Sequence, residues 1–439
     1  MNILFVENRY KTLFWQAIAL ELEKEGHSIY WIVQNHSFTP RNFKNSYVIP
    51  YFHGQLKGVV KNYTSGIKKT ILSDRGINHY GIESDDHIFY YNYQIEKLIE
   101  IIKPDVAFGE ATLMHELLVM ENCRLKKIPF FYPSSVRYPV DRFSFYKYDT
   151  YSPYVGSNDE MEKPKALEII NTIVNRTSQP YYMDVVSSSY QEIYADKIKI
   201  LSAYISGERF NTPSPFRKLQ LNKSVKNKVK IWNKFAVEEI ENDNRFNILF
   251  PLQVQPESSV DVCATDYINQ TQIIKEIADS LSDNEILYVK PNPKPSQEYS
   301  QELITLISVH KKIKVLNQNS LMKKSFNKAD LIITISGTVA MEAILSNKPV
   351  IVFCDGLLFE SDNCMKISTP FEVSNIIEII KIGKFPILTD IEKVEYLNKI
   401  NRSSFEGFIG DGFEGRAFLK DNNNLNKVVN AFKQIILKI

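Results

Sequence analysis

The 439-residue sequence has few cysteines and no long hydrophobic run. Its four cysteines lie far apart with no CxxC pair, which excludes the usual zinc spacings and a dense disulfide framework: Cys123, Cys263, Cys354 and Cys364. No run of about 18 apolar residues occurs, and the N-terminus lacks the pattern of a signal peptide. We therefore expect a chain of the reducing cytosol that is neither exported nor membrane-spanning.

A net charge of one sign is also lacking. The 53 Lys and Arg residues nearly cancel the 51 Asp and Glu residues, which leaves +2 at pH 7. No global field therefore favours nucleic acid as a partner. The composition, 44% hydrophobic and 12% aromatic, is that of a folded globular protein, and the length favours two domains.

Alternating apolar runs and helical patterns predict two Rossmann-like, doubly wound α/β domains. Ile3–Val6 and Ser28–Val33 are expected strands around a helix, and five strand-like runs follow Arg245, beginning with FNILFPLQV. The predicted division is a domain over 1–210, a basic linker over 211–244, a second domain over 245–400, and a helical segment over 401–439 that packs back on the first. Few regular elements are expected between Tyr138 and Tyr154.

Polar residues follow several predicted strands of the second half. In open α/β sheets, ligands bind at the carboxyl ends of the strands. The residues expected there to bind phosphate or a nucleotide are Gln253, Lys290, Asn292, Lys294, Ser336, Gly337, Thr338 and Glu342. The alternatives are an N-capped turn at the SGT tripeptide and a solvated Pro-Lys turn at VKPNPKP. No DxD occurs at a strand end, so no metal is expected.

Two carboxylates at strand ends are candidates for catalysis. Glu257 follows the first strand of the second half, where Asp261 is better suited to capping, and Glu110 ends DVAFGE in the first half. The candidates for binding an acceptor or a sugar carboxylate are His115, Ser134, Ser135, Arg137 and Arg142. For His115 a structural role is the more common alternative, and for Arg142 a salt bridge to Asp141 or another acid.

The segment between Asn211 and Asn244 is strongly basic, with apolar residues at helical spacing. Its lysines are Lys218, Lys223, Lys226, Lys228, Lys230 and Lys234. They could rest on anionic lipid at the cytoplasmic face of an inner membrane. The alternative is a solvated interdomain helix.

The order of PLQVQPE, VKPNPKP and ITISGTVAMEAILSNKPVIVF resembles the capsule polysaccharide biosynthesis proteins, which include bacterial Kdo transferases. The segments FGE and PSSVRYPVDRFSFY are similar to that group too. The resemblance implies a GT-B fold with two domains facing a cleft, and a CMP-activated acidic sugar as donor. It also implies that the SGT turn binds phosphate.

Two residues depart from the family pattern. Asn292 stands where the family usually has the His of a His-Pro pair, and Glu257 replaces the more usual Asp. Because Asn cannot carry a proton, assistance to the leaving group is expected from Lys290 or Lys294.

The resemblance thus implies a glycosyltransferase that moves Kdo or a nonulosonic acid, such as sialic, pseudaminic or legionaminic acid, from CMP to a capsule, lipopolysaccharide or lipid-linked acceptor. Glu110 is the first choice for base, or for nucleophile if configuration is retained, and Glu257 is the second. No cofactor is expected. The alternatives are a UDP- or GDP-sugar transferase, an epimerase, and a non-catalytic partner in capsule assembly or export. The particular sugar, the acceptor, the stereochemistry and the oligomeric state stay open.

Overall fold

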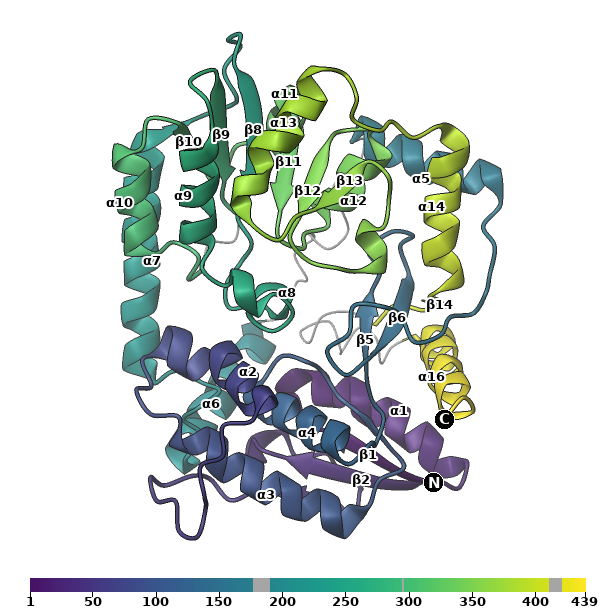
Figure 1. The fold of residues 1–439 in the computed structure, drawn as a ribbon. Helices are drawn as coiled ribbons and strands as arrows, with labels where there is room; N and C mark the ends of the chain where they lie inside the picture. The colour runs from purple at the N-terminus through teal and green to yellow at the C-terminus, as the bar shows by residue number, and fades with distance from the viewer. Residues whose placement is uncertain (177–189, 294–295, 410–420) are drawn as a thin grey trace. The chain divides into compact units, whose positions relative to one another are not determined.

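The computed structural model describes residues 1–176, 190–293, 296–409 and 421–439 (Figure 1). The chain forms two compact units. Unit 1 consists of Met1–Glu160, Pro180–Pro215 and Asn398–Ile439, and unit 2 of Met161–Gln179 and Phe216–Leu397. Each unit contains one seven-stranded sheet with helices beside it, and parallel pairs dominate both sheets. The predicted class, two Rossmann-like α/β domains, is confirmed.

The sheet of unit 1 has the order β14-β6-β5-β4-β1-β2-β3. Its strands are β1 (Asn2–Val6), β2 (Ser28–Val33), β3 (Ser46–Val48), β4 (Val106–Phe108), β5 (Phe130–Ser135), β6 (Arg142–Lys147) and β14 (Phe405–Glu406). The strands from β5 to β3 run parallel, whereas β6 is antiparallel to β5 and β14 to β6. The expectation of an irregular segment after Tyr138 was wrong at β6, because Phe143 and Phe145 are buried there in the core.

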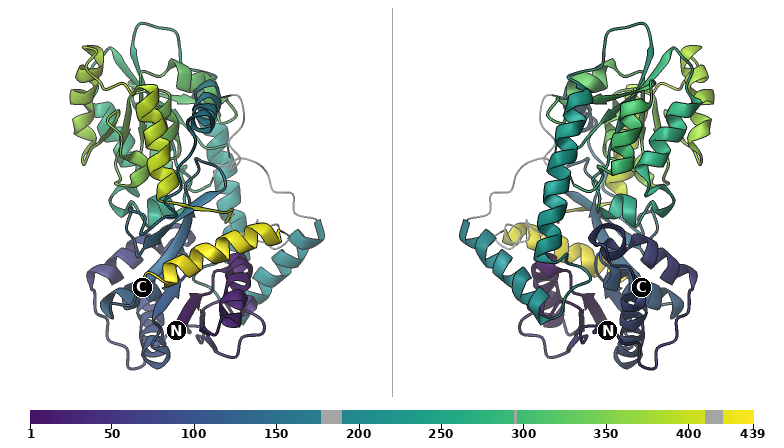
Figure 2. Two further views of the ribbon diagram at one scale, coloured as in Figure 1. Left: turned by 90° about the vertical axis from the view of Figure 1, so that its right-hand side faces the viewer. Right: turned by 90° about the vertical axis from the view of Figure 1, so that its left-hand side faces the viewer.

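The helices of unit 1 are α1 (Thr12–Lys24), α2 (Ser65–Ser73), α3 (Asp86–Ile102), α4 (Met114–Leu125), α6 (Tyr190–Ser206) and α16 (Asn422–Ile436), with short helical turns at Arg9–Lys11, His36–Phe38 and Gly76–Tyr80. The C-terminal α16 packs against α1 (Figure 2). The Phe432 ring lies 4.9 Å from that of Phe108 and 5.9 Å from that of Trp15, between centroids. The end of the chain therefore completes the core of its beginning.

The sheet of unit 2 has the order β13-β12-β11-β8-β9-β10-β7, and all its pairs are parallel. Its strands are β7 (Ala236–Val237), β8 (Phe246–Pro251), β9 (Glu285–Lys290), β10 (Ile313–Leu316), β11 (Leu331–Thr334), β12 (Val350–Val352) and β13 (Cys364–Lys366). The five predicted strand-like runs form β8 to β12. Each is largely buried, as expected for parallel strands covered on both faces.

The helices of unit 2 are α5 (Lys163–Asn175), α7 (Pro215–Phe235), α8 (Ser258–Asp261), α9 (Gln270–Ser280), α10 (Gln301–Val309), α11 (Met322–Lys328), α12 (Val339–Leu345) and α13 (Val373–Lys381). Short helical turns lie at Thr265–Tyr267, Leu357–Phe359 and Pro370–Glu372. The chain passes from unit 2 to unit 1 within α14 (Asp390–Arg402). Among the described residues, no helix is long and apolar enough to span a membrane.

These units differ from the predicted division into 1–210, 211–244, 245–400 and 401–439. Helix α5 belongs to unit 2, because Ala166, Ile170 and Ile173 are buried and the helix packs against α12. The predicted linker is also part of unit 2, since the indole of Trp232 on α7 donates a 2.9 Å hydrogen bond to the Leu316 carbonyl and β7 pairs with β10. Residues 401–409 and 421–439 belong to unit 1, the part of the chain on which the C-terminal segment was expected to pack.

Candidate functional site

Three neighbouring strands of unit 2 end beside predicted site residues. Lys290 closes β9 and pairs in register with Pro251, the last residue of β8. Gln253 follows β8 by two residues, and Ser336 follows β11 by two. Because adjacent strands lie about 4.8 Å apart, these three ends occupy roughly 10 Å of the carboxyl edge of the sheet. The structure therefore places Gln253, Lys290 and Ser336 at one edge of the sheet, where ligands bind in open α/β folds.

The Ser336–Gly337–Thr338 turn is closed by the side chain of Gln253. With the carboxamide oriented by its hydrogen-bond partners, its oxygen accepts from the Ser336 N–H at 3.1 Å and from the Gly337 N–H at 2.8 Å. The Gly337 N–H also donates to Thr334 Oγ1 at 3.2 Å. Gln253 therefore supplies an oxygen to both N–H groups, and phosphate binding at this turn stays a prediction.

Two further features of the turn bear on the predicted alternatives. Thr338 is the N-cap residue of α12, yet its side chain makes no capping hydrogen bond. A Cβ atom on Gly337 would lie 2.9 Å from Thr334 Oγ1 and 3.1 Å from the Gln253 amide, so only glycine fits without a shift. Gly337 therefore allows the close approach of Gln253 to the turn. Helix capping by the Thr338 side chain does not account for the SGT sequence, because that capping bond is absent.

Lys290 is a buried cation at the end of β9. Its side chain is only 4% exposed, and Nζ donates to the carbonyls of Pro291 at 3.1 Å and Gln318 at 3.0 Å. Burial lowers its pKa to about 8. Within the part of the chain that the structure describes, Lys290 forms no salt bridge. A buried ammonium group without a counter-charge favours the binding of an anion. Asn292 follows two residues later, whereas Lys294 lies outside the described residues.

A hydrogen-bonded network holds the segment after β8. Gln270 accepts from the Gln253 N–H at 2.9 Å, donates to the Gln253 carbonyl at 2.8 Å and donates to Gln255 Oε1 at 2.9 Å. Gln255 donates to Asp261 at 2.8 Å, and the Glu257 N–H donates to the same carboxylate at 2.8 Å. Asp261 therefore has the structural role expected of it, while the side chain of Glu257 is exposed.

Glu298 is a second carboxylate near Glu257, and the sequence analysis missed it. It is 3% exposed, and its two oxygens accept from the Ser296 N–H at 3.0 Å each. Burial raises its pKa to about 7, and the charge of Glu257 adds to the rise. Perturbed carboxylates of this kind often mark functional sites. No motif or periodicity points to Glu298, because its burial depends on how two loops meet: the Gln297 N–H donates to the Gln255 carbonyl.

Glu342, one turn into α12, lies in a buried ion pair. Its Oε2 accepts from Nη2 of Arg176 at 2.7 Å, and the Arg176 guanidinium lies 3.8 Å over the ring of Phe326. Arg176 Nε is buried and has no hydrogen-bond partner among the described residues. Glu342 was predicted to bind the nucleotide, but its carboxylate is engaged with Arg176. No sequence pattern points to Arg176, since only the return of α5 to unit 2 places it beside Glu342.

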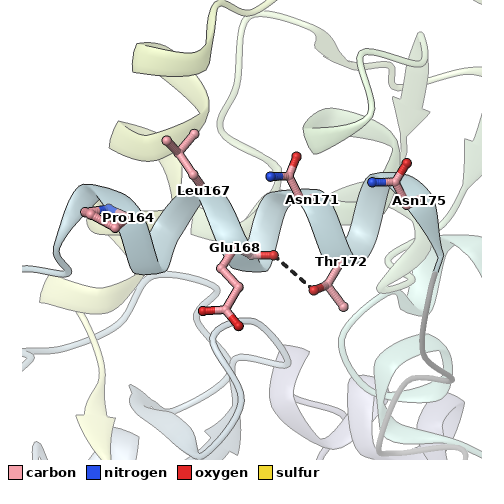
Figure 3. A pocket seen from close by; sticks show the side chains of 6 residues that line it. All are labelled: Pro164, Leu167, Glu168, Asn171, Thr172 and Asn175. Carbon is pink, nitrogen blue, oxygen red and sulfur yellow. Dashed lines mark hydrogen bonds between the residues drawn. The ribbon is translucent and has the colours of Figure 1, made fainter.

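A hollow of about 430 Å³ runs along one face of α5 (Figure 3). The residues that line it are Pro164, Leu167, Glu168, Asn171, Thr172 and Asn175. The Thr172 hydroxyl is already used, because it donates to the Glu168 carbonyl at 3.0 Å. The lining side chains come from a single helix face, so they do not converge on a common point, and we place no chemistry there.

In unit 1, Glu110 follows β4 and lies beside a lysine. Its Oε1 is 3.5 Å from Lys11 Nζ, and its backbone N–H donates to Glu116 Oε1 at 3.1 Å. Glu116 is fully buried and also accepts from Asn8 and Thr112. The loop that carries Glu110 is therefore braced by a carboxylate that the sequence analysis did not select.

His115 has a structural environment. It is fully buried, its Nε2 donates to the Glu7 carbonyl at 2.7 Å, and the Asn211 amide donates to its Nδ1 at 3.3 Å. Both ring nitrogens are satisfied by the tautomer protonated at Nε2. This geometry favours the structural alternative over contact with an acceptor, because no polar atom of the ring is left for a ligand.

Arg142 is likewise engaged within unit 1. Its guanidinium donates to Ser404 at 2.8 Å, to the Asn401 carbonyl at 2.9 Å and to Asp159 at 3.0 Å. The geometry thus favours the salt bridge considered as the alternative, with Asp159 as the acid. The remaining acceptor candidates lie at or just after the end of β5: Ser134, Ser135 and Arg137. Their contact with an acceptor stays a prediction.

The residues at the carboxyl edge of the sheet in unit 2 include groups that can bind an anion, and an exposed carboxylate follows β8 in the same unit. Lys290 supplies a positive charge, the Ser336 and Thr338 side chains supply hydroxyls, and Glu257 supplies an exposed carboxylate. No group of three or more His, Cys, Asp or Glu side chains that could hold a metal occurs among the described residues. We define Gln253, Glu257, Lys290 and the Ser336–Thr338 turn as the strand-end cluster.

Comparison with known proteins gives one family and several distant structures. Residues 167–357 match the family model described as capsule polysaccharide biosynthesis protein. No curated protein matches. The similar solved structures include the KpsC beta Kdo 2,7 transferase of Thermosulfurimonas dismutans, with 12% identity, 75% of this chain and 86% of that chain covered, and a TM-score of 0.34.

Two others are the UDP-GlcNAc 2-epimerase of Neisseria meningitidis, with 14% identity, coverages of 92% and 99% and a TM-score of 0.28, and MurG of Acinetobacter baumannii, with 13% identity, coverages of 91% and 94% and a TM-score of 0.26. With scores this low, the likenesses carry no argument about this chain. The family match, in contrast, spans the whole strand-end cluster. The match covers less than half of the chain and includes the segments whose motifs resemble the capsule polysaccharide biosynthesis proteins.

Proposed function

We propose that this protein is a glycosyltransferase that transfers an acidic sugar, Kdo or a nonulosonic acid, from a CMP-sugar to a hydroxyl group of a surface glycan or glycolipid. The observation that carries the proposal is the buried ammonium group of Lys290, which has no acidic partner among the described residues. It lies at the carboxyl end of β9, within the residues that match the family model. The family supports a role in capsule synthesis, and the cluster supports the binding of an anionic donor.

The phosphate of a CMP-sugar supplies the counter-charge that Lys290 lacks. The ammonium group is held by two carbonyl oxygens, so its remaining N–H is available to a third acceptor. A phosphate oxygen there would restore the charge balance and raise the pKa of Lys290 again. When the glycosidic bond to phosphate breaks, the negative charge on CMP grows, and Lys290 stabilises that charge.

The proposed reaction balances without a cofactor. The acceptor hydroxyl oxygen forms a bond to the anomeric carbon, while the bond from that carbon to the phosphate oxygen breaks and its electron pair leaves with CMP. A carboxylate takes the proton of the hydroxyl group. The candidates are Glu110, held beside Lys11 in unit 1, and Glu257, exposed in the strand-end cluster of unit 2. Asn292 can donate a hydrogen bond to phosphate but cannot act as an acid.

The donor is tested by thermal stabilisation with CMP, UDP and GDP, because a ligand that binds the folded state raises the apparent stability. CMP is expected to raise the melting temperature more than UDP or GDP. Lys290→Met should abolish this response.

Lys348→Met is the matched control. Lys348 is a partly buried lysine with a lowered pKa, and its Nζ donates to the carbonyls of Asn327 and Ala329 at 2.9 and 2.7 Å. It precedes β12 and so lies at the opposite edge of the same sheet. The control should keep the CMP response. Selective stabilisation by UDP or GDP would contradict a CMP donor, and no response to any nucleotide would leave a non-catalytic assembly partner as the better reading.

Release of CMP from CMP-Kdo and from CMP-sialic acid, in the presence of an acceptor extract, tests the transfer itself. Glu110→Gln and Glu257→Gln separate the two candidate bases, since the variant that lacks the base loses turnover by roughly a hundredfold or more while CMP binding persists. Unchanged turnover in both variants would contradict a carboxylate base at either position.

A further inference from the structure

Helix α7 carries an unusual concentration of positive charge. Its 21 residues include seven basic residues and no acidic one, although the net charge of the whole chain is only +2. The basic residues are Arg217, Lys218, Lys223, Lys226, Lys228, Lys230 and Lys234. Helix α7 is visible as one continuous helix in unit 2 (Figure 1). Such a concentration of positive charge on one helix attracts anionic partners.

Four of these lysines form one exposed row with two large apolar residues. Phe216, Leu219, Lys223, Lys226, Lys230 and Lys234 follow one another at spacings of three or four, so they share one face of the helix. Phe216 is 71% exposed and Leu219 is 68% exposed. We call these six residues the α7 row.

The α7 row faces away from the core of unit 2. The residues of α7 that are buried are Val225 and Trp232, and both lie on the opposite side of the helix by the same spacing rule. Within the described parts of the chain, none of the four lysines of the row forms a salt bridge. Trp232 anchors the helix through its bond to the Leu316 carbonyl, while the row itself is left to solvent.

We infer that the α7 row docks on an anionic lipid bilayer. A bilayer surface offers both chemistries that the row presents: anionic headgroups for the lysines, and an apolar layer just below for Phe216 and Leu219. The row lies along a helix of roughly 30 Å, so its charges reach the surface together when the helix lies in the plane of the membrane. Nucleic acid would satisfy the lysines but would leave the two apolar side chains in water.

The inference is independent of the proposed sugar chemistry, and vesicle binding of the full chain without donor or acceptor tests it. Flotation with vesicles of phosphatidylcholine alone, and of phosphatidylcholine mixed with phosphatidylglycerol, should show binding to the anionic vesicles only, weakening as salt is added. At about fivefold per lysine, the variant K223Q/K226Q/K230Q/K234Q should lose affinity on the order of several hundredfold.

A matched control removes the same charge elsewhere in unit 2. The variant K311Q/K323Q/K324Q/K384Q changes four exposed lysines that make no salt bridge among the described residues, and it should bind nearly as the wild type does. The variant F216S/L219S keeps every charge and should lose about tenfold, a loss that high salt does not remove. All six changed positions of the α7 row are exposed, so the melting temperatures should stay close to that of the wild type.

Three outcomes would overturn the inference. The first is equal binding to neutral and anionic vesicles, and the second is an equal loss of affinity in both quadruple variants. The third is unchanged vesicle binding by F216S/L219S together with tight RNA binding that depends on the lysines of the α7 row. The proposed function is separable, because CMP stabilisation of the K223Q/K226Q/K230Q/K234Q variant should match the wild type. Lys290→Met should lose the CMP response but keep vesicle binding, whereas K223Q/K226Q/K230Q/K234Q should lose vesicle binding but keep the CMP response. These two results together would support both the proposed function and the membrane inference.

Discussion

Lys290 illustrates how a single buried residue can set the pH range of ligand binding. Burial holds its pKa near 8, below the ordinary value of a lysine, so the ammonium form is present at neutral pH and is lost in the alkaline range. An anion that pairs with Lys290 binds the protonated form more tightly. The charge state at this one position therefore links binding to proton uptake.

We predict that CMP affinity falls as the pH rises above about 8, by at most about tenfold per pH unit. The fall should continue until the pKa of Lys290 in the bound state is reached. Calorimetric titration between roughly pH 7 and pH 10 measures it. In Lys290→Met any residual binding should show no such slope, and a slope of the same size in that variant would show that another group titrates.

The pKa of Glu298 is shifted in the opposite direction to that of Lys290. Burial raises its pKa to about 7, above the 4.5 of an ordinary Glu, so the folded state binds a proton more tightly than the unfolded state does. Its contribution to stability is complete below about pH 4.5 and is lost as the pH rises through about 7. The free energy of unfolding should therefore fall by roughly 2 kcal/mol between about pH 5 and pH 8.

Denaturant unfolding of Glu298→Gln at these two pH values tests the assignment. The neutral amide cannot titrate, so the fall should shrink by most of its size in the variant. A Glu257→Gln variant is the control for the neighbouring charge, and it should lower the pKa of Glu298 and reduce the fall only in part. An unchanged pH dependence in Glu298→Gln would contradict this account.

At the scale of elements, one ion pair joins α5 to α12. The pair of Arg176 and Glu342 is largely buried, so removal of either partner leaves a charge in a poorly solvated place. The contact adds to the burial of Ala166, Ile170 and Ile173 in holding α5 to unit 2, although α5 lies between two segments of unit 1 in the chain.

Arg176→Met is expected to destabilise the protein by about 3–5 kcal/mol, because the Glu342 carboxylate is left buried and unpaired. The double variant Arg176→Met/Glu342→Gln should recover part of that loss, which gives a coupling energy between the two positions. Denaturant unfolding of both single variants and the double variant measures it. Additive effects would show that the two side chains do not depend on each other.

At the scale of the whole molecule, the end of the chain is needed for the core of its beginning. Phe432 on α16 is fully buried between aromatic residues of unit 1. Phe432→Ala should therefore cost about 3–5 kcal/mol of stability. Phe371→Ala, at a side chain that is 59% exposed in unit 2, should change stability by less than about 1 kcal/mol. Equal effects would mean that α16 does not belong to the core.

Some features of the protein follow from local sequence. The buried strands β8 to β12 appear as continuous apolar runs because parallel strands are covered on both faces, and their ends locate Gln253, Lys290 and Ser336. The end of a strand is set by residues that are adjacent in the sequence, so a short stretch of sequence is enough to locate it. The motifs that resemble the capsule polysaccharide biosynthesis proteins lie in the same short segments, and the family match covers them.

Other features depended on contacts between residues far apart in the chain. Arg176 meets Glu342 across 166 positions, the Asn211 amide caps His115 across 96, and the burial of Glu298 depends on Gln255. The division into units turned on the return of α5 and α16 to sheets formed elsewhere. The sequence by itself determined strands β8 to β12, the motifs within the family match and the concentration of charge on α7. Only the tertiary structure decided which polar groups are buried and paired, because burial and pairing are properties of neighbours in space, which no local pattern contains.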